Sequence, residues 1–409
     1  MAALDMDSFD KALKVRYTDG AIRNMVYKEH PFLAMVPKMT TFTGKSLEIP
    51  IIGGLPTGRA ATFSVAQTNK APGIYKSFNI TRVSDYGLAS IDGETILASQ
   101  GDPGAFLRAA VVEVDGILQQ VSNSLARGLY GNGSGSLGAI GSQSTVTLTL
   151  ANPEDVVNFE VGMVIVSAAN AASALNDSGE ARTITAVDRD AGTLTCAAAD
   201  SGWDGVSGAG TADLLFQQGD YVTTSDRLKV SGLAAWLPAA APADTFFGVV
   251  RTSDPVRYGG IRYSGSAETI EEALIGAGAR AFRHGARVDT CLMNPTNVGA
   301  LQKSLGSKVV FDVAKSSDGK IGFESIVVMT PAGRVKVVAD PDCPVNVCYL
   351  LRLDSWKLYS LGEAPMILRH GDDLKFLRDG TADAVEIRTG YYAQLGCNAP
   401  GWNVRIALA

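Results

Sequence analysis

The length and composition of the chain describe a folded protein with more than one lobe. Its 409 residues are too many for one ordinary hydrophobic core. Hydrophobic residues make up 46% of the chain and charged residues 19%, a balance that excludes a largely disordered protein. The net charge of -6 argues against a dedicated nucleic-acid binder, because contacts to phosphate need concentrated Lys and Arg.

The start of the chain and its cysteines bear on where the protein is made. The first residues, MAALDMDSFDKALK, contain no apolar core of a secretion signal. No run approaches the roughly eighteen apolar residues that a membrane-spanning helix needs. The five cysteines are scattered, which fits free thiols in a reducing compartment. We therefore expect a soluble chain that is made in the cytoplasm and has no membrane contact.

Residues 1–45 are expected to form an N-terminal arm. Ile22, Met25 and Val26 have helical spacing, and Pro31 is expected to close that segment. An apolar cluster with little local partner follows directly, consisting of Phe32, Leu33, Met35 and Val36. The cluster is either a strap that packs on its own domain or an arm that lies on a neighbouring subunit.

Residues 46–93 show the alternation of β-strands on both sides of a long polar connection. Apolar residues alternate with polar ones from 47 to 51 and again from 78 to 80. A connection of this length is unusual inside a compact domain. It is either a disordered tip or an extended two-stranded loop that gains stability from a neighbour's surface. In the second case Arg59, Lys70 and Lys76 are the candidates to engage that surface by charge.

The segment 94–138 contains the strongest helical signal of the chain. The apolar residues of this stripe recur at steps of three and four, and they are Leu107, Val111, Val114, Leu118, Val121, Leu125 and Leu129. Pro103 suits the first turn, and the glycines from Gly131 onward end the run. The spacing predicts one helix from Asp102 to about Tyr130, roughly 40 Å long at 1.5 Å per residue. We expect this helix to be the spine of the fold.

Residues 139–225 differ in composition from the rest of the chain. They are rich in Thr, Ser, Ala and Gly, and no helical period persists. Short strand patterns occur at 145–150, 163–166, 183–187 and 193–196. Asp190, Ala191 and Gly192 mark a hairpin turn between the last two. The pattern predicts an inserted small β-domain, either a barrel or a sandwich.

The remainder of the chain alternates between helix and strand, which indicates an α+β or α/β lobe. Helices are expected at 267–284 and 298–305. Strands are expected at 290–293, 325–329, 335–338 and 347–353. Residues 361–409 are mainly strand, and alternation from Trp402 to Leu408 predicts that the chain ends inside a sheet.

Residue types that carry catalysis or bind metal lack the spacing that such chemistry requires. His30, His284 and His370 are far apart and are expected at the surface or at helix ends. Cys343 and Cys348 lack the second pair of ligands that a zinc site needs. We therefore expect no catalytic site, no metal and no cofactor.

One motif matches a dinucleotide-binding fingerprint. The segment 133–138, GSGSLG, satisfies G-x-G-x-x-G. That fingerprint needs a strand before it and a helix after it, so that the helix N-terminus meets the pyrophosphate. Here the expected helix precedes the motif and strands follow it. The segment is therefore interpreted as a flexible linker into the insert.

The order of these elements resembles the major capsid protein of tailed bacteriophages, which has the Hong Kong 97-type fold. Local stretches also resemble that family, namely 32–38 (FLAMVPK), 101–103 (GDP), 129–133 (LYGNG), 293–295 (MNP) and 344–356. The resemblance implies an α+β fold with a long spine helix, an extended β-loop, axial and peripheral domains, and an added all-β insertion domain.

The resemblance also implies a division of the chain and a role. Residues 46–93 would carry the extended loop, centred on about 51–75. Residues 94–138 and 226–286 would form the peripheral domain, residues 287–360 the axial domain, and residues 361–409 the terminal strands of both. The subunit would assemble in the host cytoplasm into pentamers and hexamers of an icosahedral virion shell, in only weak contact with packaged double-stranded DNA.

Partners and alternatives follow from the same resemblance. The short arm implies a separate scaffolding protein, or none, with a portal and a decoration protein as further partners. The insert is expected on the outer surface, because an inward module would compete with DNA for volume. A same-fold alternative is an encapsulin-like compartment that holds cargo enzymes. A different alternative is a hydrolase with an unrecognised site.

Overall fold

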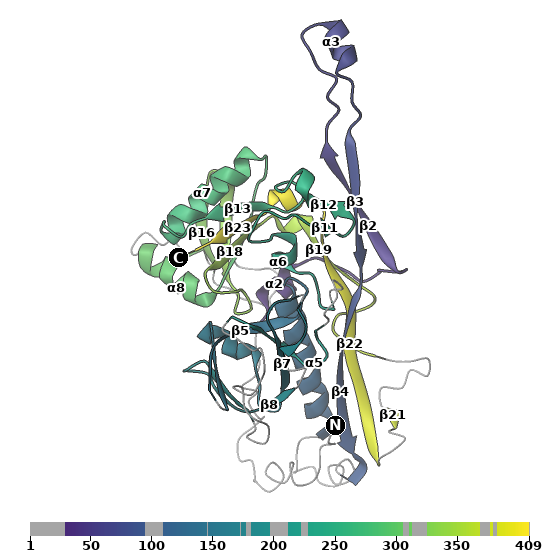
Figure 1. The fold of residues 1–409 in the computed structure, drawn as a ribbon, viewed down its shortest axis with the longest axis vertical. Coiled ribbons are helices and arrows are strands. Elements are labelled where there is room, and N and C mark those ends of the chain that lie inside the picture. The colour runs from purple at the N-terminus through teal and green to yellow at the C-terminus, as the bar shows by residue number, and fades with distance from the viewer. Residues whose placement is uncertain are drawn as a thin grey trace.

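The structure is a computed structural model, and it places the body of the chain between a projecting ribbon and a small barrel (Figure 1). It describes residues 29–94, 109–144, 146–171, 173–176, 181–196, 212–221, 228–305, 311–312, 325–368, 377–378 and 383–408. The fold is α+β, with five sheets in the described part, one of which is closed into a barrel.

The body is organised around one long antiparallel strand pair. Strand β4 (Val83–Asp92) pairs along its whole length with β22 (Ala384–Cys397), from Val83 opposite Ala393 to Asp92 opposite Ala384. The other strands of this sheet are β1 (Lys38–Met39), β19 (Trp356–Ser360), β20 (Met366–Ile367) and β21 (Leu377–Arg378). Helix α5 (Ala109–Gly128) lies along the β4–β22 pair (Figure 1).

The apolar stripe predicted for the spine explains why α5 lies on this sheet. Val121, Leu125 and Leu129 are buried in the main core of the body. Gly87 on β4 permits the close approach, because a Cβ there would lie 2.7 Å from side-chain atoms of both Ile117 and Val121. The described helix begins at Ala109, so the predicted start at Asp102 and Pro103 lies outside the described residues.

An aromatic cluster fills the centre of the same core. The short helix α6 (Leu233–Trp236) carries Trp236, whose ring meets Phe78, Phe246 and Trp356 at centroid distances of 4.9, 4.9 and 6.2 Å. The indole N–H of Trp236 donates to the Leu395 carbonyl at 3.1 Å. Helix α2 (Pro31–Met35) and the hairpin of β11 (Thr245–Phe246) and β12 (Val249–Val250) pack on this cluster.

A second lobe is built on a seven-stranded mixed sheet. Its order is β13-β23-β18-β14-β17-β16-β15. The strands are β13 (Ile261–Ser264), β14 (Thr290–Met293), β15 (Phe311–Asp312), β16 (Ser325–Thr330), β17 (Gly333–Ala339), β18 (Val347–Leu351) and β23 (Val404–Ala407). Helices α7 (Ile270–Arg283) and α8 (Pro295–Leu305) pack against it. A capping box between Thr269 and Glu272 fixes the start of α7.

The insert is a closed six-stranded barrel. Its order is β10-β5-β6-β9-β8-β7. The strands are β5 (Ser136–Ser144), β6 (Thr147–Leu150), β7 (Val164–Ala168), β8 (Arg182–Asp188), β9 (Thr193–Cys196) and β10 (Leu214–Gln217). The 3-10 helix η1 (Pro153–Asn158) covers one end of the barrel's own core. The predicted turn at Asp190–Gly192 joins β8 to β9, with the Asp188 side chain accepting from the backbone N–H groups of Asp190 and Ala191.

The ribbon consists of β2 (Ser46–Gly54) and β3 (Ile74–Thr81), paired antiparallel, and it ends in helix α3 (Phe63–Thr68). Figure 1 shows it projecting away from both lobes. The remaining short elements are the 3-10 turns η4 (Arg251–Ser253), η6 (Leu353–Ser355) and η7 (Pro400–Trp402).

Several predicted boundaries are wrong because tertiary pairing decides them. Strand β4 belongs to the body sheet, so the ribbon ends near Thr81 and not at 93. The barrel begins at Ser136, inside the segment interpreted as a linker, because that segment pairs with β10. Strand β13 and helix α7 belong to the seven-stranded lobe, although residues 226–286 were expected in the peripheral domain. Pro31 begins helix α2, and the helical segment at 22–26 that it was expected to close lies outside the described residues. Trp402 lies in a 3-10 turn instead of a strand.

Candidate subunit-contact site

The ribbon is held rigidly at its base by one segment of the body. A Cβ at Gly53 would overlap the hydroxyl of Tyr258, so only glycine permits this approach. The Arg257 guanidinium donates to the Gly53 carbonyl. Lys76 donates to the Ser253 hydroxyl at 3.0 Å, and its ammonium lies 4.5 Å from the centre of the Tyr258 ring. These contacts fix the direction in which the ribbon leaves the body.

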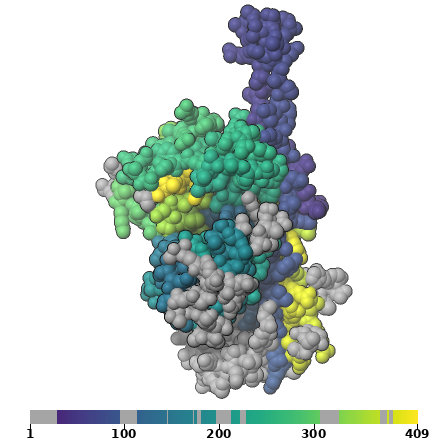
Figure 2. Space-filling model, viewed as in Figure 1, coloured from purple at the N-terminus to yellow at the C-terminus, as the bar shows by residue number. Residues whose placement is uncertain are grey.

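At this base and beyond it, the ribbon exposes large apolar side chains. Leu55 and Phe63 are each 79% exposed, Tyr75 is 73% exposed and Ile52 is 66% exposed. Ile52 and Tyr75 are directly opposite each other across the two strands, so they form one apolar pair on one face. The space-filling view in Figure 2 shows the tip standing clear of the rest of the molecule. An apolar surface on a projecting element is typical of a protein–protein contact site.

The three basic residues predicted for contact have different surroundings. Arg59 and Lys70 are exposed on the tip and remain candidates for a contact with another subunit. Lys76 is half-buried at the base, where it contacts Ser253 and Tyr258 of its own subunit. Lys76 therefore contributes to the contacts between the base of the ribbon and the body of its own subunit.

The apolar candidates in the arm need a correction. Phe32 is 1% exposed and Leu33 is 7% exposed, and both lie in the main core of their own subunit. The Phe32 ring packs 5.4 Å from that of Tyr130, and Met35 is half-buried beside the same core. Phe32 and Leu33 are thus unavailable to a neighbour, and the strap interpretation describes them.

The sequence interpretation missed the apolar residues of the tip and the helix that carries two of them. The stretch 53–73 contains few large apolar residues, which led to a polar assignment. A usable signal was present, because Phe63 and Val65 interrupt a polar stretch in which they have no local apolar partners.

His30 was expected at the surface or at a helix end, and it lies at the N-cap of α2 with its ring largely buried. Its Nδ1 lies 2.5 Å from Asp342 Oδ2 and its Nε2 lies 2.8 Å from Asn123 Oδ1. The sequence could not reveal this pairing, because 312 residues separate His30 from Asp342. His284 is placed as predicted, at the C-cap of α7, and His370 lies outside the described residues.

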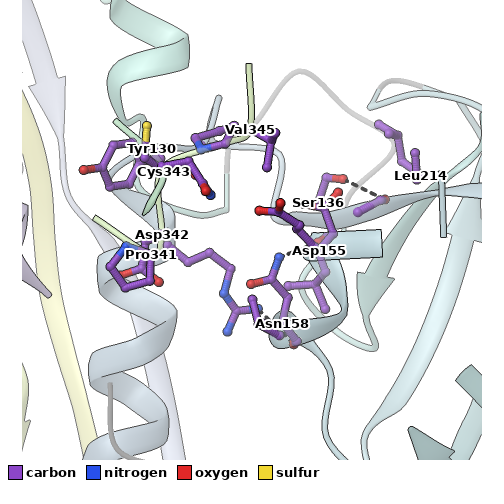
Figure 3. A pocket seen from close by; sticks show the side chains of 18 residues that line it. Tyr130, Ser136, Asp155, Asn158, Leu214, Pro341, Asp342, Cys343 and Val345 are labelled. Atoms are coloured by element: carbon purple, nitrogen blue, oxygen red, sulfur yellow. Dashed lines mark hydrogen bonds between the residues drawn. The ribbon is translucent and has the colours of Figure 1, made fainter. Parts of the chain in front are cut away.

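A cleft of about 320 Å³ separates the barrel from the end of α5 and the turn after β17. Figure 3 shows Asp155 and Asn158 of the barrel on one side and Tyr130, Asp342 and Cys343 on the other. Burial raises the pKa of Asp155 to about 6, and the neighbouring Glu154 charge adds to the effect against a hydrogen bond from Asn152. Two hydrogen bonds join the two sides, from the Thr296 hydroxyl to Glu154 at 2.8 Å and from Arg127 to the Asn158 carbonyl at 3.3 Å.

The described part of the chain holds neither a metal cluster nor a membrane-spanning helix. No group of three or more His, Cys, Asp or Glu side chains there is placed to hold a metal ion. The same residues contain no helix that is long and apolar enough to cross a membrane. The fingerprint at 133–138 follows helix α5 and runs into strand β5, an order opposite to that of a dinucleotide site.

The chain is similar to known capsid proteins in sequence and in structure. Residues 212–392 match the family described as SU10 major capsid protein. The capsid subunit of cyanophage A-1(L) is 14% identical with a TM-score of 0.56, over 97% of this chain and 96% of that one. The capsid of the empty GTA particle is 8% identical with a TM-score of 0.50, over the whole of both chains. No curated protein sequence matches the chain.

One further similar structure concerns the alternative compartment function. The holo-SrpI encapsulin complex from Synechococcus elongatus PCC 7942 is 7% identical, with a TM-score of 0.48, over 100% of this chain and 96% of that one.

A long helix lying on an extended strand pair, a mixed second lobe and a projecting ribbon together give the chain a Hong Kong 97-type fold, like that of the cyanophage capsid subunit. The match to the capsid-protein family covers residues 212–392. The fold and this partial family match support a major capsid protein of the tailed-bacteriophage kind.

Proposed function

We propose that the subunit forms the pentamers and hexamers of an icosahedral shell around double-stranded DNA, and that each ribbon lies on an adjacent subunit. The observation that carries this proposal is the ribbon itself. Its base is fixed by Arg257 and Tyr258, while Leu55 and Phe63 expose 79% of their surface beyond it. Burying such side chains against a neighbour stabilises the contact by about 25 cal/mol per Å² of apolar surface.

The two lobes take the roles of the peripheral and axial domains. The β4–β22 sheet with α5 forms the peripheral domain, at the edge of each ring of subunits. The seven-stranded lobe forms the axial domain, which meets its copies around the five-fold and six-fold axes. Ring closure allows the same head-to-tail contact to be used by every subunit without forming an open filament.

Charge supports the placement of the barrel on the outer surface of the shell. The segment 136–221 contains eleven acidic and two basic residues, whereas the rest of the chain contains 31 acidic and 34 basic residues. DNA is a dense polyanion, so it repels a segment of this charge and is attracted only weakly by the remainder. The body would therefore face the genome in weak contact, with the barrel pointing away from it.

The remaining partners follow from the same role. A separate scaffolding protein and a portal would complete assembly in the host cytoplasm, and the outward barrel offers a place for a decoration protein. The chemistry of the chain would be contact with its copies, so we propose no enzymatic activity. This differs from an encapsulin-like compartment in the content of the shell, which electron microscopy of purified particles would reveal as DNA or protein.

The proposal is tested by polar substitutions on the tip. Replacing Phe63 and Val65 of α3 by Ser removes apolar surface that makes no core contact in the subunit, so the subunit should fold normally. The matched control replaces Ser64 and Gln67, exposed on the same short helix, by Ala. We expect the control to form shells and the Phe63→Ser/Val65→Ser variant to remain as small oligomers, measured by size-exclusion chromatography and negative-stain microscopy.

Normal assembly of the tip variant would contradict the proposed contact. If the Phe63→Ser/Val65→Ser variant forms normal shells at the control's yield, the apolar tip is not part of a subunit contact. A variant with an altered circular dichroism spectrum would be replaced by Leu55→Ser, which lies outside the helix.

A further inference from the structure

A buried polar cluster joins three parts of the chain that are far apart in sequence. His30, just before α2, contacts Asp342 at 2.5 Å and Asn123 of α5 at 2.8 Å. Both partner atoms, a carboxylate oxygen and an amide oxygen, are hydrogen-bond acceptors. A histidine ring satisfies two acceptors only when both of its nitrogens carry a proton, so this geometry suits the charged imidazolium.

A second carboxylate completes the cluster. Asp340 is 1% exposed, and its Oδ2 accepts from the Phe32 backbone N–H at 3.0 Å and from the Tyr130 hydroxyl at 2.7 Å. Its Oδ1 accepts from the Asp342 backbone N–H at 2.9 Å. The turn that follows β17 is thereby connected to the first residues of α2 and to the end of the spine.

The charges around these groups favour the presence of a proton. Asp340 and Asp342 lie two residues apart in one turn, so the negative charge of Asp342 acts on the Asp340 carboxyl group. The Tyr130 hydroxyl and the Cys343 thiol, both buried, face the same turn and carry no positive charge. Arg127 on α5 is the cation near Asp342 among the described residues, and burial lowers its pKa.

The pKa values of the two titrating groups, Asp340 and His30, are both raised. Burial raises the pKa of Asp340 to about 6, and the Asp342 charge adds to this against three hydrogen bonds. Burial alone would lower the pKa of His30, but the hydrogen bond and charge of Asp342 outweigh it and raise that pKa. A raised carboxyl pKa and a raised imidazole pKa both favour the folded cluster as pH falls and weaken it as pH rises.

We propose that His30, Asp340 and Asp342 form a proton-operated latch, which holds α2 and the second lobe firmly on the spine helix in mildly acidic solution and loosens in alkaline solution. Loosening exposes the start of α2 first, because the His30 ring and the Phe32 N–H join the described part of the arm to Asp342 and Asp340. This latch is a property of the single subunit, and it is independent of how subunits contact one another.

The test is hydrogen–deuterium exchange of the full-length chain, read on a peptide that covers residues 30–36. After correction for intrinsic exchange, we expect protection to fall roughly tenfold between about pH 5 and pH 8, since each pKa unit contributes a factor of ten. A peptide within α7, which does not contact the cluster, serves as the internal reference.

Three variants separate the latch from a general effect of pH. Asp340→Asn keeps an acceptor for Phe32 and Tyr130 but cannot titrate, so it should reduce the change to about threefold or less. His30→Gln keeps one donor but removes the titrating ring, and it should also flatten the profile. His284→Gln makes the same chemical change at the exposed C-cap of α7 and should leave the profile of residues 30–36 unchanged.

Three results would contradict the latch. Equal protection of residues 30–36 at both pH values in the unmodified protein would overturn the proposal. A full pH response in Asp340→Asn would also overturn it, and this variant decides the matter if His30→Gln fails to fold. An equal flattening by His284→Gln would assign the response to another part of the molecule.

Discussion

The ribbon and the barrel are both β-structures that leave the body through two connections, yet they differ in how they treat apolar surface. The barrel closes its sheet and buries its own core, in which Leu148, Leu194 and Leu215 are fully enclosed. The ribbon has two strands and one short helix, and it leaves Leu55 and Phe63 in solvent.

This difference shows which module is complete in a single subunit. A closed barrel has no free strand edges and pairs its backbone internally. A two-stranded ribbon has a free edge on each side and too few neighbours to bury its side chains, so in isolation it is marginal. The barrel therefore depends on its own core, whereas the ribbon, in the role proposed for it, depends on another copy of the chain.

The largest effect that this comparison predicts is the loss of assembly when the tip is removed. Replacing residues 55–72 by Asn-Gly closes β2 and β3 with a short turn and leaves their base contacts to Arg257 and Tyr258 in place. We expect a folded subunit that forms no shells, because the exposed apolar surface is gone. Size-exclusion chromatography with negative-stain microscopy measures this outcome.

Normal particles from the tip deletion would contradict the proposed dependence of the ribbon on another copy, since the ribbon would then be as dispensable as any surface loop. The control is a conservative change at the base, Lys76→Arg, which keeps a cation near Ser253 and Tyr258. It should leave shell formation intact.

The next effect concerns the barrel's own core. Leu148 on β6 is fully buried among barrel residues, so Leu148→Ala should destabilise the barrel by about 3 kcal/mol. The next residue, Thr149, points to the other face of the strand and is half-buried, and Thr149→Ala should cost about 0.5 kcal/mol or less. Hydrogen exchange of β6 and β9 peptides measures the difference.

If the barrel folds independently, exchange in β22 of the body should not change in Leu148→Ala. A parallel loss of protection in β22 would show that barrel and body unfold as one unit. The comparison would then need revision, because the barrel would not be complete by itself.

Much of this architecture could be predicted from local pattern. The apolar stripe at Val121, Leu125 and Leu129 predicts the face of α5 that is buried, because helical period alone decides it. The strand character of residues 361–409 likewise predicts β22. The signal is strong wherever a residue's surroundings come from its own element.

The features that sequence missed depend on distant partners. Strand β5 starts in a Gly/Ser-rich stretch, and only pairing with β10, far along the chain, makes Ser136–Gly138 a strand. The division between lobes failed for the same reason, since β13 pairs with the C-terminal β23. Within the candidate site, charge indicated Arg59 and Lys70, but the exposure of Leu55 and Phe63 follows from the absence of covering elements around the ribbon.

A smaller effect is expected at the barrel's side of the cleft. The pKa of Asp155 is raised from 3.8 to about 6, so its charged form opposes folding above about pH 6 and this effect disappears below its unfolded value. Asp155→Asn should therefore stabilise the barrel by about 1 kcal/mol near pH 7 and by almost nothing near pH 4. Asp190→Asn, at the exposed turn between β8 and β9, is the control. A gain of equal size at both pH values would contradict the assignment.

Only a small effect on the body should come from removing the barrel altogether. The Lys229 N–H donates to the Gly133 carbonyl at 3.3 Å and Asn132 is bridged to Ser231, so the two connections already lie side by side. Replacing residues 134–228 by Asn-Gly closes them as a two-residue hairpin. This cut differs from the predicted insert of 139–225, which would leave part of β5 attached to the body.

Among the described residues, the body loses one ion pair and two side-chain hydrogen bonds in this variant. Lys229 keeps Asp85 at 2.9 Å but loses Asp220 at 3.0 Å, and the hydrogen bonds of Arg127 and Thr296 to the barrel disappear. Such contacts contribute about 1 kcal/mol each or less, whereas the body's apolar core stays intact. The melting temperature of the body should thus fall by only a few degrees, as measured by circular dichroism. A body that fails to fold without the barrel would show that the barrel completes the core across the cleft, and the contrast with the ribbon would no longer hold.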